Sequence, residues 1–209
     1  MRRLLATTVL SLFLGGLLLA APRPVAAQED TLAKIKRTGA LTIGFRESSP
    51  PFSFVAANDP KPQGYSIDLC LRIADGIKKE LALPQLDVKW VKVTPETRIA
   101  SVANGTVDIE CGSTTKTLGR MAQVDFTALT FLDGGSLLTV SAANINKLTD
   151  LAGKRVAVIP GTTTEAAVRD VVKKLGLQNV TLLAVKDHSE GVAALDDGRI
   201  DAYASDRTL

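Results

Sequence analysis

Short apolar runs alternate along this chain with stretches in which apolar residues return every three or four positions. The runs predict strands over residues 41–44, 86–93, 106–109, 126–131, 136–141, 155–159, 180–185 and 200–204, with a hairpin over 52–65. The periodic stretches predict helices over residues 30–37, 66–81, 94–104, 148–153, 162–176 and 189–198. Strands that alternate with helices are typical of α/β proteins with mainly parallel sheets.

One local pattern occurs twice. Residues 103–109 (ANGTVDI) and residues 196–202 (DDGRIDA) each read as a helix end, a glycine and the start of a strand, and a polar stretch follows each of them. Two such units predict two lobes with a cleft between them, a first over residues 28–131 and a second over residues 132–209. Helix–glycine–strand turns also recur by chance in α/β proteins. The alternative is therefore that the repeat is a coincidence and does not indicate two lobes.

The N-terminus has the layout of a secretory leader. Arg2 and Arg3 precede an apolar run over residues 4–19, and small residues precede a cut expected before Gln28. A retained membrane anchor is the alternative. Removal of residues 1–27 takes away three basic residues, so the 25 basic residues become 22 against 22 acidic ones. The exported chain, expected in the periplasm, then has no basic excess for nucleic acid.

The two cysteines of this exported chain raise the question of a disulfide. Cys70 falls on the apolar stripe of a predicted helix, and Cys111 follows a predicted strand. Nothing in the sequence indicates that they pair, and a buried thiol at Cys70 is the favoured interpretation. Cys111 is then left to pair with a cysteine that the chain lacks.

Residues 110–120 (ECGSTTKTLGR) combine hydroxyls, small residues and an arginine directly after a predicted strand. Ligands gather at this edge of open α/β sheets, and an arginine matches a carboxylate with two parallel hydrogen bonds. Other polar residues follow other strands or open helices in the same way. The candidate ligand-binding residues are Arg46, Arg98, Ser113, Thr115, Arg120, Thr162, Thr163, His188 and Asp206.

Taken one at a time, these residues could be surface charges or helix caps. Together, three arginines and a histidine favour two carboxylates, and Asp206 suits an ammonium group, which describes an acidic amino acid. An enzyme would need a nucleophile with a base, or a metal. The sequence has no His/Cys cluster with metal-ligand spacing, and neither a metal nor a cofactor is expected. Nothing in the sequence brings Cys111 and His188 together as a nucleophile and its base, so an enzyme is not expected.

The chain resembles the polar amino acid solute-binding proteins of ABC importers, and most of all the glutamate/aspartate-binding members. The motifs that carry the resemblance are GFRESS at 44–49, ECGSTT at 110–115, KDH at 186–188 and AYASD at 202–206. The resemblance implies a type II clamshell of two α/β lobes, each a mainly parallel sheet with flanking helices. It also implies a monomer that captures glutamate or aspartate and delivers it to a membrane permease.

The resemblance also implies a role for each candidate residue. Arg120, Thr115 and the turn at 161–163 would take the α-carboxylate, Asp206 and Ser113 the α-amine, and Arg46, Arg98 and His188 the side-chain carboxylate. Pro95 stands where the family often has a hydroxyl, three positions before Arg98, which leaves the preference between glutamate and aspartate open. The family continues for several tens of residues past Leu209, so both lobes are expected to be incomplete. The alternative function is a dehydratase on the same fold, acting on a prephenate-like acid.

Overall fold

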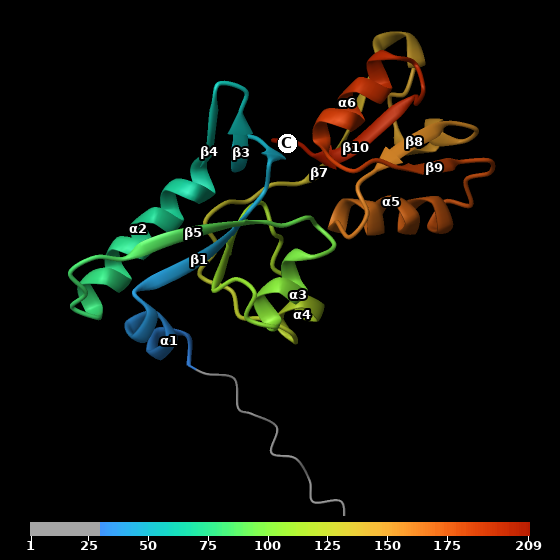
Figure 1. Cartoon of the computed structure of the whole chain (residues 1–209). Coiled ribbons are helices and arrows are strands. Elements are labelled where there is room, and N and C mark those ends of the chain that lie inside the picture. Colours follow the sequence, from blue (N-terminus) through green and yellow to red (C-terminus); the bar gives the residue numbers. More distant parts are fainter. Residues whose placement is uncertain (1–29) are drawn as a thin grey trace, which may run out of the picture.

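The computed structural model describes residues 30–209, so the predicted leader over 1–27 lies outside the described residues. Three sheets, with helices packed around them, make up this part of the chain (Figure 1). In chain order the elements are α1 (Thr31–Thr38), β1 (Ala40–Phe45), β2 (Ser48–Ser49), β3 (Ser53–Ala56), β4 (Asp59–Gln63), α2 (Tyr65–Glu80), β5 (Asp87–Lys92), α3 (Arg98–Ala103), β6 (Ile109–Cys111), α4 (Leu118–Met121), β7 (Gly135–Thr139), the 3₁₀ helices η1 (Ser141–Ala143) and η2 (Leu148–Leu151), β8 (Arg155–Val158), α5 (Thr163–Lys174), β9 (Thr181–Ala184), α6 (His188–Asp196) and β10 (Ala202–Asp206).

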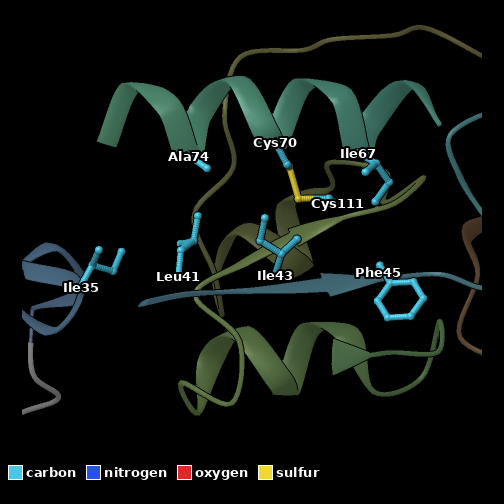
Figure 2. Packing of buried hydrophobic residues seen from close by; sticks show 8 residues of the cluster. All are labelled: Ile35, Leu41, Ile43, Phe45, Ile67, Cys70, Ala74 and Cys111. Atoms are coloured by element: carbon cyan, nitrogen blue, oxygen red, sulfur yellow. A yellow bond between two sulfur atoms is a disulfide. The ribbon is translucent and has the colours of Figure 1, made fainter. Parts of the chain in front are cut away.

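The first lobe is built on a parallel sheet in the order β5-β1-β6. Helix α2 lies along one face of β1, and its Ile67, Cys70 and Ala74 point toward the strand (Figure 2). Leu41 and Ile43 of β1 meet them and are 1% and 0% exposed. A small antiparallel sheet in the order β2-β3-β4 adds to this lobe.

The second lobe is built on a four-stranded sheet in the order β7-β10-β8-β9, in which only β7 runs antiparallel to its neighbour. Helices cover both faces of this sheet. Ala157 faces the cluster that includes Ala194 and Leu195 of α6, whereas Val156 and Val158 face the cluster that includes Val168 of α5. A strand that is buried on both faces reads as an uninterrupted apolar run, which is why β8 was visible in the sequence.

The repeated turn is built in the same way in both lobes. Asp108 donates its backbone N–H to the carbonyl of Thr42, and its carboxylate accepts the Thr42 N–H at 2.9 Å. Asp201 donates to the carbonyl of Arg155, and its carboxylate accepts the Arg155 N–H at 2.7 Å. Each aspartate therefore ties the start of a strand to its parallel neighbour, and each also holds a basic side chain, Lys34 or Arg155.

Two predictions about the first lobe were wrong. Cys70 and Cys111 form a disulfide, because the apolar stripe of α2 faces the buried end of β6 and brings the two Cα atoms to 6.4 Å (Figure 2). Residues 126–131 form no strand. They run along the connection between α4 and β7, where Leu129 is 66% exposed and Phe131 is 49% exposed, and they pair with no other strand among the described residues.

Other elements are shifted by a few residues. The strand expected at 106–109 is β6, which begins only at Ile109, after the turn that Asp108 closes. Helices α2 and α6, expected from residues 66 and 189, each begin one residue earlier, directly after Gly64 and Asp187. The proposed lobe boundary between residues 131 and 132 falls in the connection between α4 and β7 and stays a prediction. Within residues 30–209, none of the helices combines the length and apolar composition of a membrane span.

Candidate ligand-binding site

A cavity of about 20 Å³ lies where the two lobes meet, and every predicted site residue except Arg120 lines it. Its walls come from the ends of β1 and β10 and from the first turns of α3, α5 and α6. A space of this size holds about one water molecule. The lobes would therefore have to separate before an amino acid could occupy the cavity.

Two arginines of the first lobe are buried beside this cavity. Arg46 follows β1 and is 4% exposed, and Arg98 opens α3 and is 3% exposed. Ser53 fixes the backbone of Arg46, since its hydroxyl accepts the Arg46 N–H at 2.9 Å and lies 3.1 Å from the Arg46 carbonyl, to which it donates. Burial lowers the pKa of both guanidinium groups, that of Arg98 to about 10. Buried positive charges of this kind are stable only with an anionic partner.

His188, the first residue of α6, is held by two side chains of β10. Its Nδ1 lies 2.7 Å from the Tyr203 hydroxyl and 3.3 Å from the Ser205 hydroxyl. Gly191 makes room for this contact, because a Cβ at this position would lie 2.6 Å from the Tyr203 ring. Burial, followed by the charge of Arg46, lowers the pKa of His188 to about 4. The imidazole is thus neutral near pH 7, and burial raises the pKa of Tyr203 to about 12.

The second lobe supplies hydroxyls and one carboxylate. Thr162 caps α5, since its hydroxyl accepts the Glu165 N–H at 3.0 Å and donates to the Ile159 carbonyl at 2.8 Å. Asp206 ends β10, and its carboxylate accepts the hydroxyl of Thr164 at 2.6 Å. Thr164 is 8% exposed and was missed in the sequence. The run of threonines at 162–164 was the available signal, but nothing in it separated Thr164 from its neighbours.

Arg120 stands apart from the cavity and joins the two lobes. Its guanidinium donates to the Thr115 carbonyl at 2.8 Å and, across the interface, to the Gly161 carbonyl at 3.0 Å. The hydroxyls of Thr115 and Thr163 also meet across the interface, at 3.3 Å. These contacts describe a closed arrangement in which part of Arg120 is already occupied by backbone carbonyls.

A wider hollow of about 500 Å³ opens beside the small cavity. The two spaces share five lining residues: Ser113, Thr115, Thr163, Thr164 and Asp206. Of these two spaces, Arg46, Arg98 and His188 line the small cavity and not the wider hollow. The site therefore has an inner end with two buried arginines and an outer end with hydroxyls and Asp206.

The sequence model for bacterial extracellular solute-binding proteins, family 3, matches residues 41–195 of this chain. The chain belongs to this family. Its members are extracytoplasmic proteins of ABC importers, and the relatives below are transport proteins and not enzymes.

Individual family members resemble the chain over most of its length. It is 43% identical to the L-glutamate/L-aspartate-binding protein of Pseudomonas aeruginosa over 98% of this chain and 68% of the relative. It is 38% identical to a glutamate/aspartate import solute-binding protein of Salmonella typhimurium over 99% of this chain and 68% of the relative.

A solved structure with the same fold bears on the enzyme alternative. It is an ancestral amino acid-binding protein, a precursor of cyclohexadienyl dehydratase, with a TM-score of 0.71 and 30% identity. The similarity covers 85% of this chain and 74% of that one. The relatives of this chain are named for binding and import, which favours the binding function over the dehydratase alternative. Separately, residues 30–209 hold no cluster of three or more potential metal ligands.

One acidic residue near the arginines of this family member was not assigned a role from the sequence. Glu110 opens the ECGSTT motif and lies on β6, where its Oε2 accepts the Thr114 hydroxyl at 2.7 Å. Burial lowers the pKa of Arg46, Arg98 and Arg120, and Glu110 is the foremost charge that opposes this effect at each of them. The motif pointed to this stretch, but only the fold shows that Glu110 faces the arginines.

Proposed function

We propose that this chain captures an acidic amino acid, glutamate or aspartate, outside the cytoplasm and delivers it to the permease of an ABC importer. The names of its relatives in Pseudomonas and Salmonella support the ligand and the transport role. Export through a leader over residues 1–27 and action as a monomer belong to the same proposal.

The observation that carries the proposal is the inner end of the site. Arg46 and Arg98 are almost completely buried there, and neither guanidinium forms an ion pair within 4.0 Å in the part of the chain that the structure describes. A ligand carboxylate would satisfy both, with the neutral His188 beside them. An amide in its place would leave the two charges unpaired.

The outer end has the groups that every amino acid needs. Asp206 and Ser113 are suited to the α-amine, because a carboxylate and a hydroxyl can both accept from an ammonium group. Thr115, Thr162, Thr163 and the N-terminus of α5 are suited to the α-carboxylate. Arg120 would join them once the lobes separate and its bonds to backbone carbonyls rearrange.

Closure links capture to delivery. The contacts of Arg120 with Gly161 and of Thr115 with Thr163 hold the lobes together in the closed arrangement. A ligand that bridges the two lobes would favour closure, because it gains contacts in that state alone. A permease could then distinguish the loaded protein from the empty one by its shape.

The choice between glutamate and aspartate depends on the inner wall. Pro95 lines the cavity and offers no hydroxyl to the ligand. The relatives bind both amino acids according to their names, so both are included in the proposal.

Calorimetry with glutamate, aspartate, glutamine and asparagine tests the proposal. Breaking a buried charge pair costs about 3–5 kcal/mol, so we expect the two acids to bind at least about a hundredfold more tightly than their amides. Arginine and leucine serve as ligands of the wrong charge and shape. Glutamine binding as tightly as glutamate would contradict the acidic-ligand proposal, although a role in import could survive it.

A further inference from the structure

One carboxylate, that of Glu110, acts on all three arginines of the site. Glu110 lies on β6, its Oε2 accepts the Thr114 hydroxyl, and its Oε1 is buried with no hydrogen-bond partner in residues 30–209. Thr114 thus orients the carboxylate but leaves one oxygen unpaired. A buried, unpaired carboxylate oxygen is costly, so its position calls for a reason.

Arg98 connects Glu110 to the ligand site. It lines the small cavity between the lobes and also a second cavity of about 200 Å³, which Glu110 lines as well. The Nε of Arg98 is buried and has no hydrogen-bond partner among the described residues. The side chains of Arg98 and Glu110 therefore line the same cavity, and each has one buried polar atom without a hydrogen-bond partner among the described residues.

Gly112 keeps Glu110 close to a second arginine. A Cβ at Gly112 would collide with Oε1 of Glu110 and would lie 3.0 Å from Cγ of Arg46. A larger residue at this position would require the end of the Glu110 side chain to move. No nitrogen of Arg46, Arg98 or Arg120 lies within 4.0 Å of Glu110 in the part of the chain described, so the carboxylate acts through its field and not through direct ion pairs.

The charge balance shows what this field does. Three carboxylates oppose the effect of burial on the pKa of the arginines: Asp187 acts on Arg46, Asp206 acts on Arg98 and Arg120, and Glu110 acts on all three. Glu110 already neutralises part of the charge that a ligand carboxylate would otherwise meet.

We propose that Glu110 is a specificity-determining residue, whose charge competes with the ligand's side-chain carboxylate and so limits the preference for acidic over neutral amino acids. This inference rests on the proposed function. In the absence of ligand the same carboxylate stabilises the closely spaced arginines. Glu110 thus lowers the preference for acidic over neutral ligands and at the same time stabilises the ligand-free protein.

Glu110→Gln tests the inference, because glutamine has nearly the same shape and its amide oxygen can still accept from Thr114. We expect the ratio of the Kd for glutamine to the Kd for glutamate to rise about tenfold at low salt, the size of one charge interaction of about 1.4 kcal/mol. The rise should largely persist in high salt, because buried charges are screened much less than exposed ones. Glu47→Gln is the matched control, since Glu47 follows Arg46, is exposed and pairs with Lys92.

A second measurement needs no ligand. The melting temperature of the ligand-free Glu110→Gln variant should fall relative to the wild type and to Glu47→Gln, and most of the gap should remain when sodium chloride is added. A folded Glu110→Gln variant with an unchanged or smaller Kd ratio overturns the inference. If the wild type binds neither glutamate nor aspartate, the proposed function fails, and the ligand-free melting gap alone decides the role of Glu110: its absence overturns that role as well.

Discussion

The two lobes meet at one cavity but bring opposite chemistry to it. The first lobe contributes Arg46 and Arg98, two buried cations at the ends of β1 and the start of α3. The second lobe contributes hydroxyls at the start of α5, the neutral His188 at the start of α6, and Asp206 at the end of β10. The sheets are similar and carry the same repeated turn, so the difference lies in the side chains at their ends.

This difference suggests a division of labour. Asp206 and the hydroxyls of α5, together with Ser113 and Thr115 of the first lobe, suit the amine and carboxylate that all amino acids share. Arg46 and Arg98 suit only a ligand with an additional negative charge, and His188 of the second lobe lies beside them. Changes at the two buried arginines of the first lobe should therefore alter which amino acid binds. Changes at Asp206 of the second lobe should alter how tightly any amino acid binds.

The largest effect is expected from Arg46→Met, which keeps an unbranched apolar stem and removes the guanidinium with its charge. Glutamate should bind at least about a hundredfold more weakly, and glutamine should be affected far less, so that discrimination shrinks. Calorimetry with both ligands measures this. Arg72→Met, on the exposed face of α2 in the same lobe, is the control and should leave both affinities unchanged. An equal loss for glutamate and glutamine would break the proposed division of labour.

The disulfide should stabilise the first lobe and not the second. Both cysteines of the chain lie in the first lobe, where Cys70–Cys111 closes a loop with a sequence separation of 41 residues. A loop of this length predicts a loss of up to about 4 kcal/mol in the free energy of unfolding when the bond is removed. Denaturant unfolding of the Cys70→Ser/Cys111→Ser variant measures the loss, and the reduced wild type should match it. A variant as stable as the oxidised wild type would show that the bond does not brace this lobe.

Asp206→Asn tests whether the second lobe binds a group that all amino acids share. The loss of one carboxylate that faces the ligand amine should weaken glutamate and glutamine by the same factor, about ten- to a hundredfold. Thr164→Val is the companion variant, because it removes the hydroxyl that donates to Asp206 at 2.6 Å and leaves the charge in place. It should have a smaller effect of the same kind. A change in the ratio of the two affinities would place Asp206 near the side-chain end of the ligand instead.

The features of the two lobes that could be predicted from the sequence are those that depend on residues close together in the chain. The strands β1 and β8 and the repeated turn were predictable, because burial of a strand leaves a local pattern of apolar residues. The polar residues that follow strands were also predictable as a group, since the ends of parallel strands meet at one edge. The fold brings all of them but Arg120 to a single cavity.

Contacts between distant elements were not visible. The helical stripe placed Cys70 in the core but could not indicate that the end of β6 lies opposite, which is why the disulfide was missed. Residues 126–131 are apolar enough for a strand, yet a strand also needs a partner, and this segment has none among the described elements. Glu110 was likewise one polar residue among many until the fold placed the arginines around it.

The smallest expected effect is a dependence on pH. It concerns His188, a titratable group of the second lobe that lines the same cavity as Arg46 and Arg98. Burial and then Arg46 lower the pKa of His188 to about 4, below the value of about 6.5 of an exposed histidine. The unliganded protein should therefore keep its full stability above about pH 6.5 and lose stability as the pH falls from about 6.5 toward 4. A histidine-to-glutamine change at this position, His188→Gln, should flatten this part of the stability profile.

Ligand binding should shift the same titration in the opposite direction. A ligand carboxylate beside His188 favours the protonated imidazole and raises its pKa, so binding takes up a proton between about pH 4 and 6.5. The affinity for glutamate should then rise a few-fold as the pH falls from 7 toward about 5, before the carboxylate itself protonates near pH 4.3. Calorimetry in two buffers of different ionisation enthalpy counts the protons, and His188→Gln should take up none. Proton release, or uptake that persists in His188→Gln, would mean that the ligand carboxylate does not lie beside this histidine, and the inner end of the site would have to be assigned to another part of the ligand.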